Sequence, residues 1–397
     1  MASKTTASPD SPTDGLDAAP AVATHEGDVG IDDAGSSSAT RQVPAVLSDS
    51  ADAVERFIVD QLEPRLDQLQ TWNGTSPHDQ LLAAAAKRKK ITVKKISDAN
   101  QLLFLSGVVI GGMDAIITSL VSHQARRVSR SKQMTKKYLQ ASEVPTPKGR
   151  AISPTEFSRA VKYMKALGGP VAVKPSSGRA GKGISTAVRT EGELRQAWQR
   201  AMASRSATSD SKYQMIVEEH HPGVDLRVYV VGEQVAGAIV RVPFYVVGDG
   251  VSTVGELAET EIARRQDNAY LRPRQPKVTD DFLAPVGLST TDVPAAGQVR
   301  RLTEIADTSR GGGLAVDVTD ELPDALRDLA VDGLWSVPGL SAAAVDLLVP
   351  DLETGEGAVV LDINPYANIM QFRYPAYGEP RMVHDAIMEQ ILHRASR

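Results

Sequence analysis

The sequence VKPSSGRAGKG, at residues 173–183, decides more about this 397-residue chain than any other stretch. Residues 171–174 predict a short strand that ends in Lys174, and a loop with three glycines follows it. Glycines let the backbone N–H groups of such a loop approach and surround phosphate oxygens, while a lysine supplies a point charge. The stretch therefore indicates phosphate binding at the end of a strand.

The loop differs from the two best-known phosphate-binding fingerprints. Ser176 stands where a Walker A loop begins with glycine, and Gly183 stands where that loop needs Ser or Thr after Gly181-Lys182. The dinucleotide fingerprint is excluded as well, because the glycines fall as G-x-x-G-x-G. Taken alone, the segment is equally compatible with an ordinary surface loop.

A second group of polar residues lies near the C-terminus, inside two predicted strands at 342–349 and 357–364. Asp362 and Asn364 share one strand face because side chains alternate, and pairing with the preceding strand brings Asp346 beside them. Three oxygen ligands of this kind suit Mg²⁺. The alternative is that these acids only solvate strand ends, but an unpartnered acid inside an aliphatic strand is costly to bury.

Between these two groups lies IVEEHHPGVDLR, at residues 216–227. An apolar strand that runs out into acids and then Pro-Gly offers edge backbone for an adenine and a carboxylate for ribose hydroxyls. The adjacent His220 and His221 suggest zinc only weakly, because the chain has no cysteine and no helical H-x-x-x-H spacing.

The surrounding pattern is mixed helix and strand. The apolar run 102–121 is interrupted by Asp114 and by Gly111-Gly112, so it favours a buried strand and turn leading into a helix over a membrane span. Apolar residues recur at helical spacing from Ala53 to Leu69. Further helices are predicted at 81–86, 132–142 and 154–167, the last opened by Ser153-Pro154, and further strands at 91–96, 213–219, 226–231 and 234–240.

Composition limits the partners of the chain. The net charge is −5, but the first 53 residues hold nine acids against Lys4 and Arg41, a net of −7, so the remainder carries +2. That near-neutral body argues against nucleic acid as the partner. No secretory signal opens the chain, and the absence of cysteine excludes disulfides and thiol nucleophiles. We expect a cytoplasmic protein that does not bind membranes.

Several further motifs follow one another in a recognisable order. They are SKQMTK (131–136), RVP (241–243), VGDGVSTV (247–254), GG (311–312), AVDVTD (315–320), PGL (338–340), and Asn364 with YP (374–375) and Gly378. Together with the segments above, they make the chain from about Leu81 to its end resemble the ATP-grasp superfamily. The similarity is greatest to the ATP-grasp domains of cyanophycin synthetase and of the bifunctional glutathione-synthesising enzyme.

The resemblance implies an α+β fold, in which two lobes with antiparallel sheets clamp ATP, preceded by a truncated α/β domain. The expected divisions are a disordered acidic tail at 1–50, the truncated N-terminal domain at 51–130, a small lobe with the glycine-rich loop at 131–216, and a C-terminal lobe with the metal site at 217–397. Dimerisation is suggested by the resemblance alone.

The resemblance also implies roles for individual residues. Those expected to bind ATP are Lys132, Lys174, Gly178, Gly181, Lys182, Gly183, Glu218, the backbone near His221, and Asp225. Those expected to act in catalysis are Arg241, Lys174 and Arg310. Those expected to hold two Mg²⁺ ions, with Mn²⁺ as a possible substitute, are Asp346, Asp362 and Asn364.

Three departures from the family pattern bear on these roles. Asp362 stands where the family usually has Glu, which shortens the reach of the carboxylate by one methylene. Asp307 and Arg310 stand where the family has Asn and a small residue, so the acceptor pocket differs. The region before Ser131 is also shorter than in the large enzymes.

The expected reaction is phosphoryl transfer from ATP to a carboxylate, followed by attack of an amine on the acyl phosphate. Lysines, an arginine and Mg²⁺ spread the charge of the transferring group in such chemistry, and no nucleophilic side chain is needed. Amino acids or small peptides are the expected substrates. Two alternatives remain, a non-catalytic ATP-binding regulatory or scaffold module, and a kinase that releases a phosphorylated product.

Overall fold

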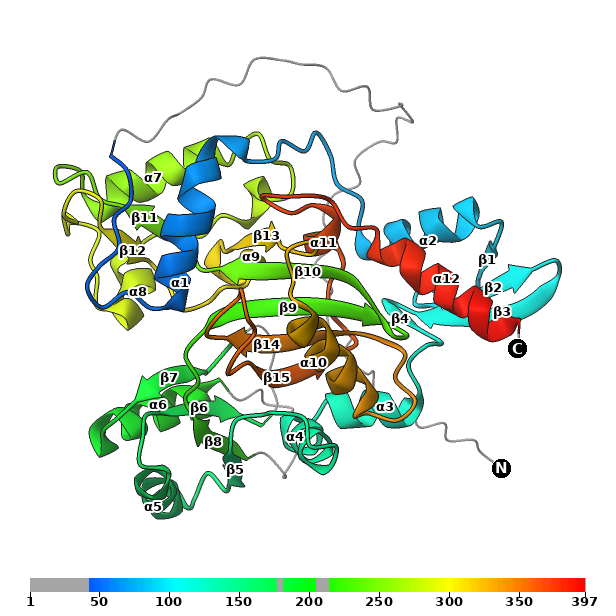
Figure 1. The fold of residues 1–397 in the computed structure, drawn as a ribbon, viewed down its shortest axis with the longest axis horizontal. Coiled ribbons are helices and arrows are strands. Elements are labelled where there is room, and N and C mark those ends of the chain that lie inside the picture. Colours follow the sequence, from blue (N-terminus) through cyan, green and yellow to red (C-terminus); the bar gives the residue numbers. More distant parts are fainter. Residues whose placement is uncertain (1–42, 177–180, 205–213, 397) are drawn as a thin grey trace, which may run out of the picture. The chain divides into compact units, whose positions relative to one another are not determined.

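The computed structural model describes residues 43–176, 181–204 and 214–396 (Figure 1). Most of the predicted acidic tail and the predicted ATP ligand Gly178 therefore lie outside the described residues. Within the described part, helices and antiparallel strands combine in an α+β fold, as predicted. None of the described helices has the length and apolar character that a membrane crossing requires.

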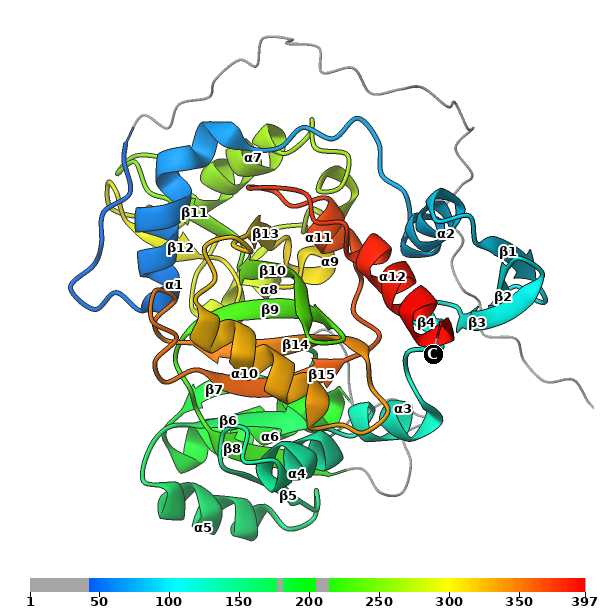
Figure 2. The ribbon, with the colours of Figure 1, turned by 45° about the vertical axis from the view of Figure 1, so that its right-hand side comes forward.

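The largest sheet has five antiparallel strands in the order β13-β10-β9-β14-β15. Their bounds are β9 (Val224–Val231), β10 (Gln234–Val242), β13 (Leu314–Asp317), β14 (Ala342–Val349) and β15 (Val359–Asn364). Helix α10 (Asp324–Trp335) packs against β9, β10, β14 and β15, as both ribbon views show (Figures 1 and 2). Gly333 permits this close approach, because a Cβ there would lie 3.1 Å from Val345 Cγ1. One face of the sheet is thereby covered.

A smaller antiparallel sheet has the order β5-β8-β6-β7. Its strands are β5 (Gly149–Ile152), β6 (Val171–Pro175), β7 (Ser185–Val188) and β8 (Met215–Glu219). Side chains of α5 (Phe157–Leu167) and α6 (Glu191–Ala203) form a separate apolar core with alternate residues of these strands, including Val171, Val173 and Val217. Lys174, Ile216 and Glu218 belong to the other alternation and lie on the opposite face.

The N-terminal part begins with a continuous helical run through α1 (Ala53–Arg56), η1 (Phe57–Leu62) and η2 (Glu63–Gln68). A four-stranded antiparallel sheet follows α2 (His78–Arg88), with strands β1 (Thr92–Lys95), β2 (Asn100–Leu105), β3 (Val108–Asp114) and β4 (Ile117–Thr118). The C-terminal helix α12 (Val383–Ala395) packs on α2. Ion pairs join these helices between Arg88 and Asp385 at 2.7 Å and between Lys89 and Glu389 at 2.6 Å.

The remaining elements connect these layers. They are α3 (His123–Ser129), α4 (Lys132–Ala141), β11 (Tyr245–Val247), α7 (Val254–Arg264), η3 (Arg272–Arg274), α8 (Asp280–Leu283), η4 (Ala284–Val286), β12 (Val299–Arg301), α9 (Thr308–Gly311) and α11 (Met370–Arg373). Helix α4 matches its predicted span closely, and the strands β14 and β15 confirm the predicted C-terminal hairpin.

One local prediction is wrong. The helix expected from residue 154 begins at Phe157, because Ser153 and Pro154 belong to a preceding turn in which the Ser153 carbonyl accepts from Glu156 N–H. The apolar run 102–121 forms strands that lead into α3, with the first turn at Ser106-Gly107, both with positive φ, and Gly111 and Gly112 lie inside β3. Gly111 is packed so closely that a Cβ would lie 2.5 Å from Ser119 Oγ, which explains the glycine without a turn.

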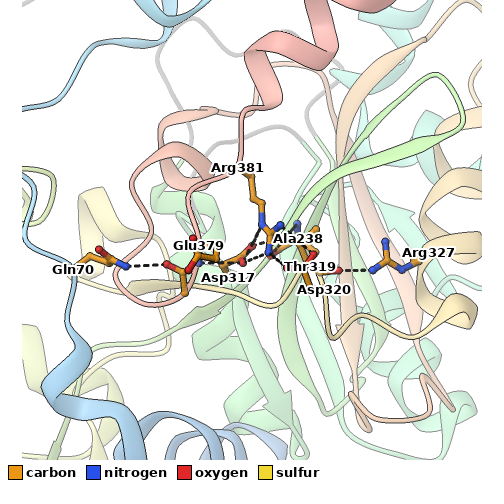
Figure 3. A network of polar contacts seen from close by, with 9 residues as sticks. Gln70, Ala238, Asp317, Thr319, Asp320, Arg327, Glu379 and Arg381 are labelled. Carbon is orange, nitrogen blue, oxygen red and sulfur yellow. Dashed lines mark hydrogen bonds and ion pairs between the residues drawn. The ribbon is translucent and has the colours of Figure 1, made fainter. Parts of the chain in front are cut away.

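The AVDVTD motif and the segment after Gly378 meet in one polar network (Figure 3). Arg381 donates to both carboxylate oxygens of Asp317 and to those of Asp320, with distances from 2.7 to 3.1 Å. Asp317 Oδ1 also accepts from Thr319 Oγ1 at 2.6 Å. Gly378 has φ +84°, and a Cβ there would lie 2.8 Å from Asp317 Cβ, so no larger residue fits. The network fixes the C-terminal segment against β13.

Candidate active site

The face of the large sheet opposite α10 carries a row of charged side chains from adjacent strands. Arg241 of β10 lies opposite Asp225 of β9, and Arg227 of β9 lies opposite Asp346 of β14. Asp346 in turn lies opposite Asp362 of β15. Residues two apart on a strand share a face, so all five side chains project to the same side, away from α10. The sequence-predicted residues Arg241, Asp225, Asp346 and Asp362 are therefore brought together.

Arginines hold the two central carboxylates of this row. Arg227 donates to both oxygens of Asp346, at 2.7 and 2.9 Å, and both residues are only 8% exposed. Arg241 donates to Asp225 Oδ1 at 3.0 and 2.6 Å and lies 3.5 Å from Asp346 Oδ2. Burial alone would raise the pKa of Asp346, but Arg227 and Arg241 outweigh it and lower that pKa well below its usual value.

Asp225 and Arg241 respond differently to the same burial. Burial is the largest influence on Asp225 and, together with the nearby Asp346 carboxylate, raises the pKa of Asp225 despite the contact with Arg241. Burial opposes the charged form of Arg241 as well, yet Asp225 and Asp346 raise the pKa of Arg241 above its usual value. Arg241 is thus a fixed positive charge on the face of the sheet opposite α10.

The outer end of the row is completed by helix α4. Its first residue, Lys132, places Nζ 3.3 Å from Asp362 Oδ2. Asp362 raises the pKa of Lys132 more than burial lowers it, and Asp346 and Glu218 add to the effect. Asn364 Oδ1 accepts from Tyr366 N–H at 2.9 Å. We call Asp225, Arg227, Arg241, Asp346, Asp362 and Lys132 the large-sheet cluster.

A second cluster lies on the open face of the small sheet. Glu218 of β8 is 2% exposed, and its Oε1 lies 2.6 Å from Lys174 Nζ of β6. Its Oε2 lies 2.9 Å from Lys136 Nζ of α4, as an ion pair rather than a well-aligned hydrogen bond. Burial raises the pKa of Glu218, but the two ammonium groups outweigh it and lower that pKa. We call Lys136, Lys174 and Glu218 the small-sheet cluster.

Two glycines in the described part of the glycine-rich loop have a left-handed backbone conformation. Gly181 and Gly183 have φ values of +72° and +77°, in the left-handed region that favours glycine. A Cβ on Gly183 would lie 2.3 Å from Ser204 Oγ at the end of α6, so the loop also needs glycine for packing. Lys182 between them is exposed.

Two predicted residues, Arg310 and His221, form no hydrogen bond or ion pair with either cluster in the described part of the chain. Arg310 is exposed on α9, while Asp307 caps that helix by accepting from Ser309 N–H at 3.1 Å. His221 follows β8, and its Nδ1 is buried with no hydrogen-bond partner among the described residues. A role in clamping substrate stays a prediction for Arg310, as does adenine binding for the His221 backbone.

Sequence reasoning missed two members of the clusters. Lys136 follows Lys132 by one helical turn, and Arg227 follows Asp225 by one strand repeat. Both spacings placed them on the same face as a predicted site residue. Their partners, Glu218 and Asp346, are 82 and 119 residues away in the chain, so spacing alone did not reveal the ion pairs.

The oxygen atoms of Asp346, Asp362 and Asn364 form a donor set that suits a hard divalent cation. Ala344, two residues from Asp346, lies opposite Asn364, so all three side chains share one face of β14 and β15. Carboxylate and amide oxygens are the ligands that Mg²⁺ takes in proteins. Each carboxylate already has a cationic partner within the chain, Arg227 for Asp346 and Lys132 for Asp362. The residues fit the ion, and a bound ion would share these carboxylates with those side chains.

Comparison with known proteins identifies the superfamily of the chain. Residues 131–231, which carry α4, the small sheet and β9, match the family model "carbamoyl-phosphate synthase L chain, ATP binding domain". The chain is 29% identical over 351 residues to cyanophycin synthetase from Nostoc sp. (strain PCC 7120), which covers 85% of this chain and 37% of that protein. The chain belongs to the ATP-grasp superfamily.

Other members of the superfamily support the fold. The glutathione biosynthesis bifunctional protein GshAB from Mannheimia succiniciproducens is 30% identical over 280 residues, which cover 67% of this ATP-grasp chain and 35% of the relative. A crystal structure of a bifunctional glutathione synthetase from Pasteurella multocida superposes with a TM-score of 0.55 at 21% identity, over 85% of this chain and 47% of the other. The chain thus spans less than two fifths of the length of the relatives it matches in sequence.

Proposed function

We propose that this ATP-grasp protein is an ATP-dependent carboxylate-amine ligase that acts in the cytoplasm on amino acids or small peptides. ATP would phosphorylate the carboxylate of one substrate, and the amine of the second would displace phosphate, releasing ADP and phosphate and forming an amide bond. The relatives named cyanophycin synthetase and glutathione biosynthesis bifunctional protein support an amino-acid or peptide substrate.

One observation carries the proposal. Helix α4 reaches both clusters from one helical turn, with Lys132 on Asp362 of the large sheet and Lys136 on Glu218 of the small sheet. The carboxylates of Asp362, Asp346 and Glu218 all raise the pKa of Lys132. The predicted phosphate-binding lysines and the predicted metal ligands thus belong to one electrostatic site.

The proposed work of the chain is electrostatic and positional. Lys132, Lys174 and the loop at Gly181–Gly183 would hold the ATP phosphates, and Glu218 would hold Lys174 in position. Asp225 and the backbone near His221 would contact ribose and adenine. Mg²⁺, held by Asp346, Asp362 and Asn364, would neutralise phosphate charge and align the phosphates. Arg241 would stabilise the negative charge that develops on the transferring phosphoryl group, because its guanidinium is fixed in place by two carboxylates before substrate arrives.

The test is incubation with ATP, Mg²⁺ and hydroxylamine, together with a pool of amino acids and dipeptides. A ligase of this kind forms a hydroxamate and releases ADP, and Asp346→Asn abolishes both while leaving ATP binding detectable. Release of AMP, or no hydroxamate with any acid of the pool, contradicts the proposal. ATP binding without Mg²⁺-dependent turnover would favour the alternative of a regulatory or scaffold module, and product formation without an amine would favour a kinase.

A further inference from the structure

Lys136 is the least expected member of the small-sheet cluster, and its contacts differ from those of Lys174. Lys136 Nζ donates to the Pro147 carbonyl and lies 3.4 Å from Thr146 Oγ1, in addition to its contact with Glu218. In the described part of the chain, the only ion pair of Lys174 is the one with Glu218. Within the described residues, Lys136 is therefore anchored by three groups and Lys174 by one.

The cluster also carries an excess of positive charge. Glu218, Lys174 and Lys136 are 2%, 7% and 8% exposed, so water screens their charges poorly. One carboxylate and two ammonium groups leave a formal charge of +1. Burial, and secondarily the like charge of Lys174, lower the pKa of Lys136, although Glu218 opposes the shift. A site with this balance attracts an anion.

Contact with a phosphate would change the ion pair between Lys174 and Glu218. Lys174 must then weaken or leave its contact with Glu218, and a buried carboxylate without a partner is costly. Lys136 avoids this cost, because it keeps its ion pair with the other carboxylate oxygen of Glu218, Oε2. Backbone geometry supports the arrangement, since a Cβ on Gly149 would lie 2.6 Å from Glu218 Cβ and would push the carboxylate away.

We propose that Lys136 is a positioning residue, which keeps the Glu218 carboxylate paired while Lys174 turns to a nucleotide phosphate. The inference rests on the proposed ATP site but assigns Lys136 no contact with ATP. Lys136 acts through Glu218, so its removal affects ligands that need Lys174 and spares ligands that do not.

The first experiment compares ADP with adenosine, which has no phosphate, by NMR titration of the full chain. Lys136→Met keeps most of the side-chain volume and is expected to weaken ADP binding about tenfold or more, while adenosine binding changes less than about twofold; tenfold corresponds to about 1.4 kcal/mol. Lys136→Arg is expected to retain ADP binding. Lys137→Met, the same charge change on an exposed neighbour, serves as the matched control.

Two results of this titration overturn the proposal. One is ADP binding by Lys136→Met equal to that of the wild-type chain. The other is an equal loss of ADP and adenosine, which would indicate that Lys136 only supports the local fold.

The second experiment needs no nucleotide, and so separates this inference from the proposed function. The Glu218 carboxyl is followed by ¹³C NMR through an acid titration in wild type, Lys136→Met and Lys137→Met. Loss of Lys136 is expected to raise the pKa of Glu218, whereas the control leaves it in place. An unchanged Glu218 titration in Lys136→Met overturns the pairing. A wild-type chain that binds no ADP contradicts the proposed ATP site instead.

Discussion

The two charged clusters differ in how completely they neutralise themselves. In the large-sheet cluster, three carboxylates face three cations, and Arg227, which cannot lose its proton, grips Asp346 with two hydrogen bonds. In the small-sheet cluster, one carboxylate serves two lysines. The first arrangement fixes geometry at the predicted metal ligands, and the second leaves net positive charge at the predicted phosphate site. The same kinds of side chain thus form a charge-balanced cluster on the large sheet and a cluster with excess positive charge on the small sheet.

The largest effect is expected from Asp346→Ala. Removing this carboxylate leaves Arg227 without its partner and weakens the balance at Arg241, and breaking a buried ion pair in this way costs about 3–5 kcal/mol. Urea unfolding at pH 7 and at pH 9 should give the same loss, because guanidinium groups stay charged throughout. Asp332→Ala, on the exposed side of α10, is the control, with a change below about 0.5 kcal/mol. A loss of similar size in both variants would contradict the central role of Asp346.

Glu218→Gln is expected to be less destabilising and to depend on pH. Two buried lysines lose their carboxylate, but a lysine can release its proton, so the loss at pH 7 should be about 1–3 kcal/mol. It should shrink as the pH rises toward 9, since neutral amines need no counter-ion. Urea unfolding at both pH values measures this. If the loss of unfolding free energy in Glu218→Gln were the same at both pH values, the two clusters would not differ in the way described above.

Acid should destabilise a third region before it removes the contributions of Glu218 and Asp346. Burial lowers the pKa of His78 in α2 and of His384 in α12 to about 4, from 6.5. The unfolded chain therefore binds these protons at a higher pH than the folded chain, and stability falls as the pH drops from about 6.5 toward 4. The pKa values of Glu218 and Asp346 are lowered, so their contributions persist above about pH 4 and are lost only below it.

Urea unfolding at pH 7.5 and pH 5 measures the histidine contribution. The wild-type chain should lose about 2 kcal/mol or more between the two, and His384→Gln should lose less. An unchanged loss in His384→Gln would point to groups other than the buried histidines, including the two clusters.

The smallest effect is expected from Asp362→Glu, which restores the residue usual in the family. The pair of Asp362 with Lys132 is partly exposed, with side-chain exposures of 24% and 21%, so stability should change little. The longer side chain extends the carboxylate toward a shared cation, and half-saturation by Mg²⁺ should fall a few-fold. Titration of ATP-dependent turnover with Mg²⁺, repeated with Mn²⁺, tests this. A higher Mg²⁺ requirement would show that the shorter Asp362 suits this site better.

Much of the fold followed from local patterns. The hairpin of β14 and β15 was predicted from two neighbouring strand segments, 342–349 and 357–364, and helix α4 was predicted at 132–142. The error arose at a proline, because Pro154 suggested a helix start but lies in the preceding turn. The glycines that interrupt the apolar run 102–121 lie within β3, where Gly111 permits close packing.

The sequence by itself determined which residue types were available for phosphate and metal chemistry, and which of them share a strand face or a helix turn. That much depends only on backbone periodicity. Tertiary structure decided the partners: Arg227 on Asp346, and Lys136 rather than Lys174 alone on Glu218. The physical reason is that an ion pair depends on the register of strands and the placement of α4, which contacts between residues far apart in the chain determine.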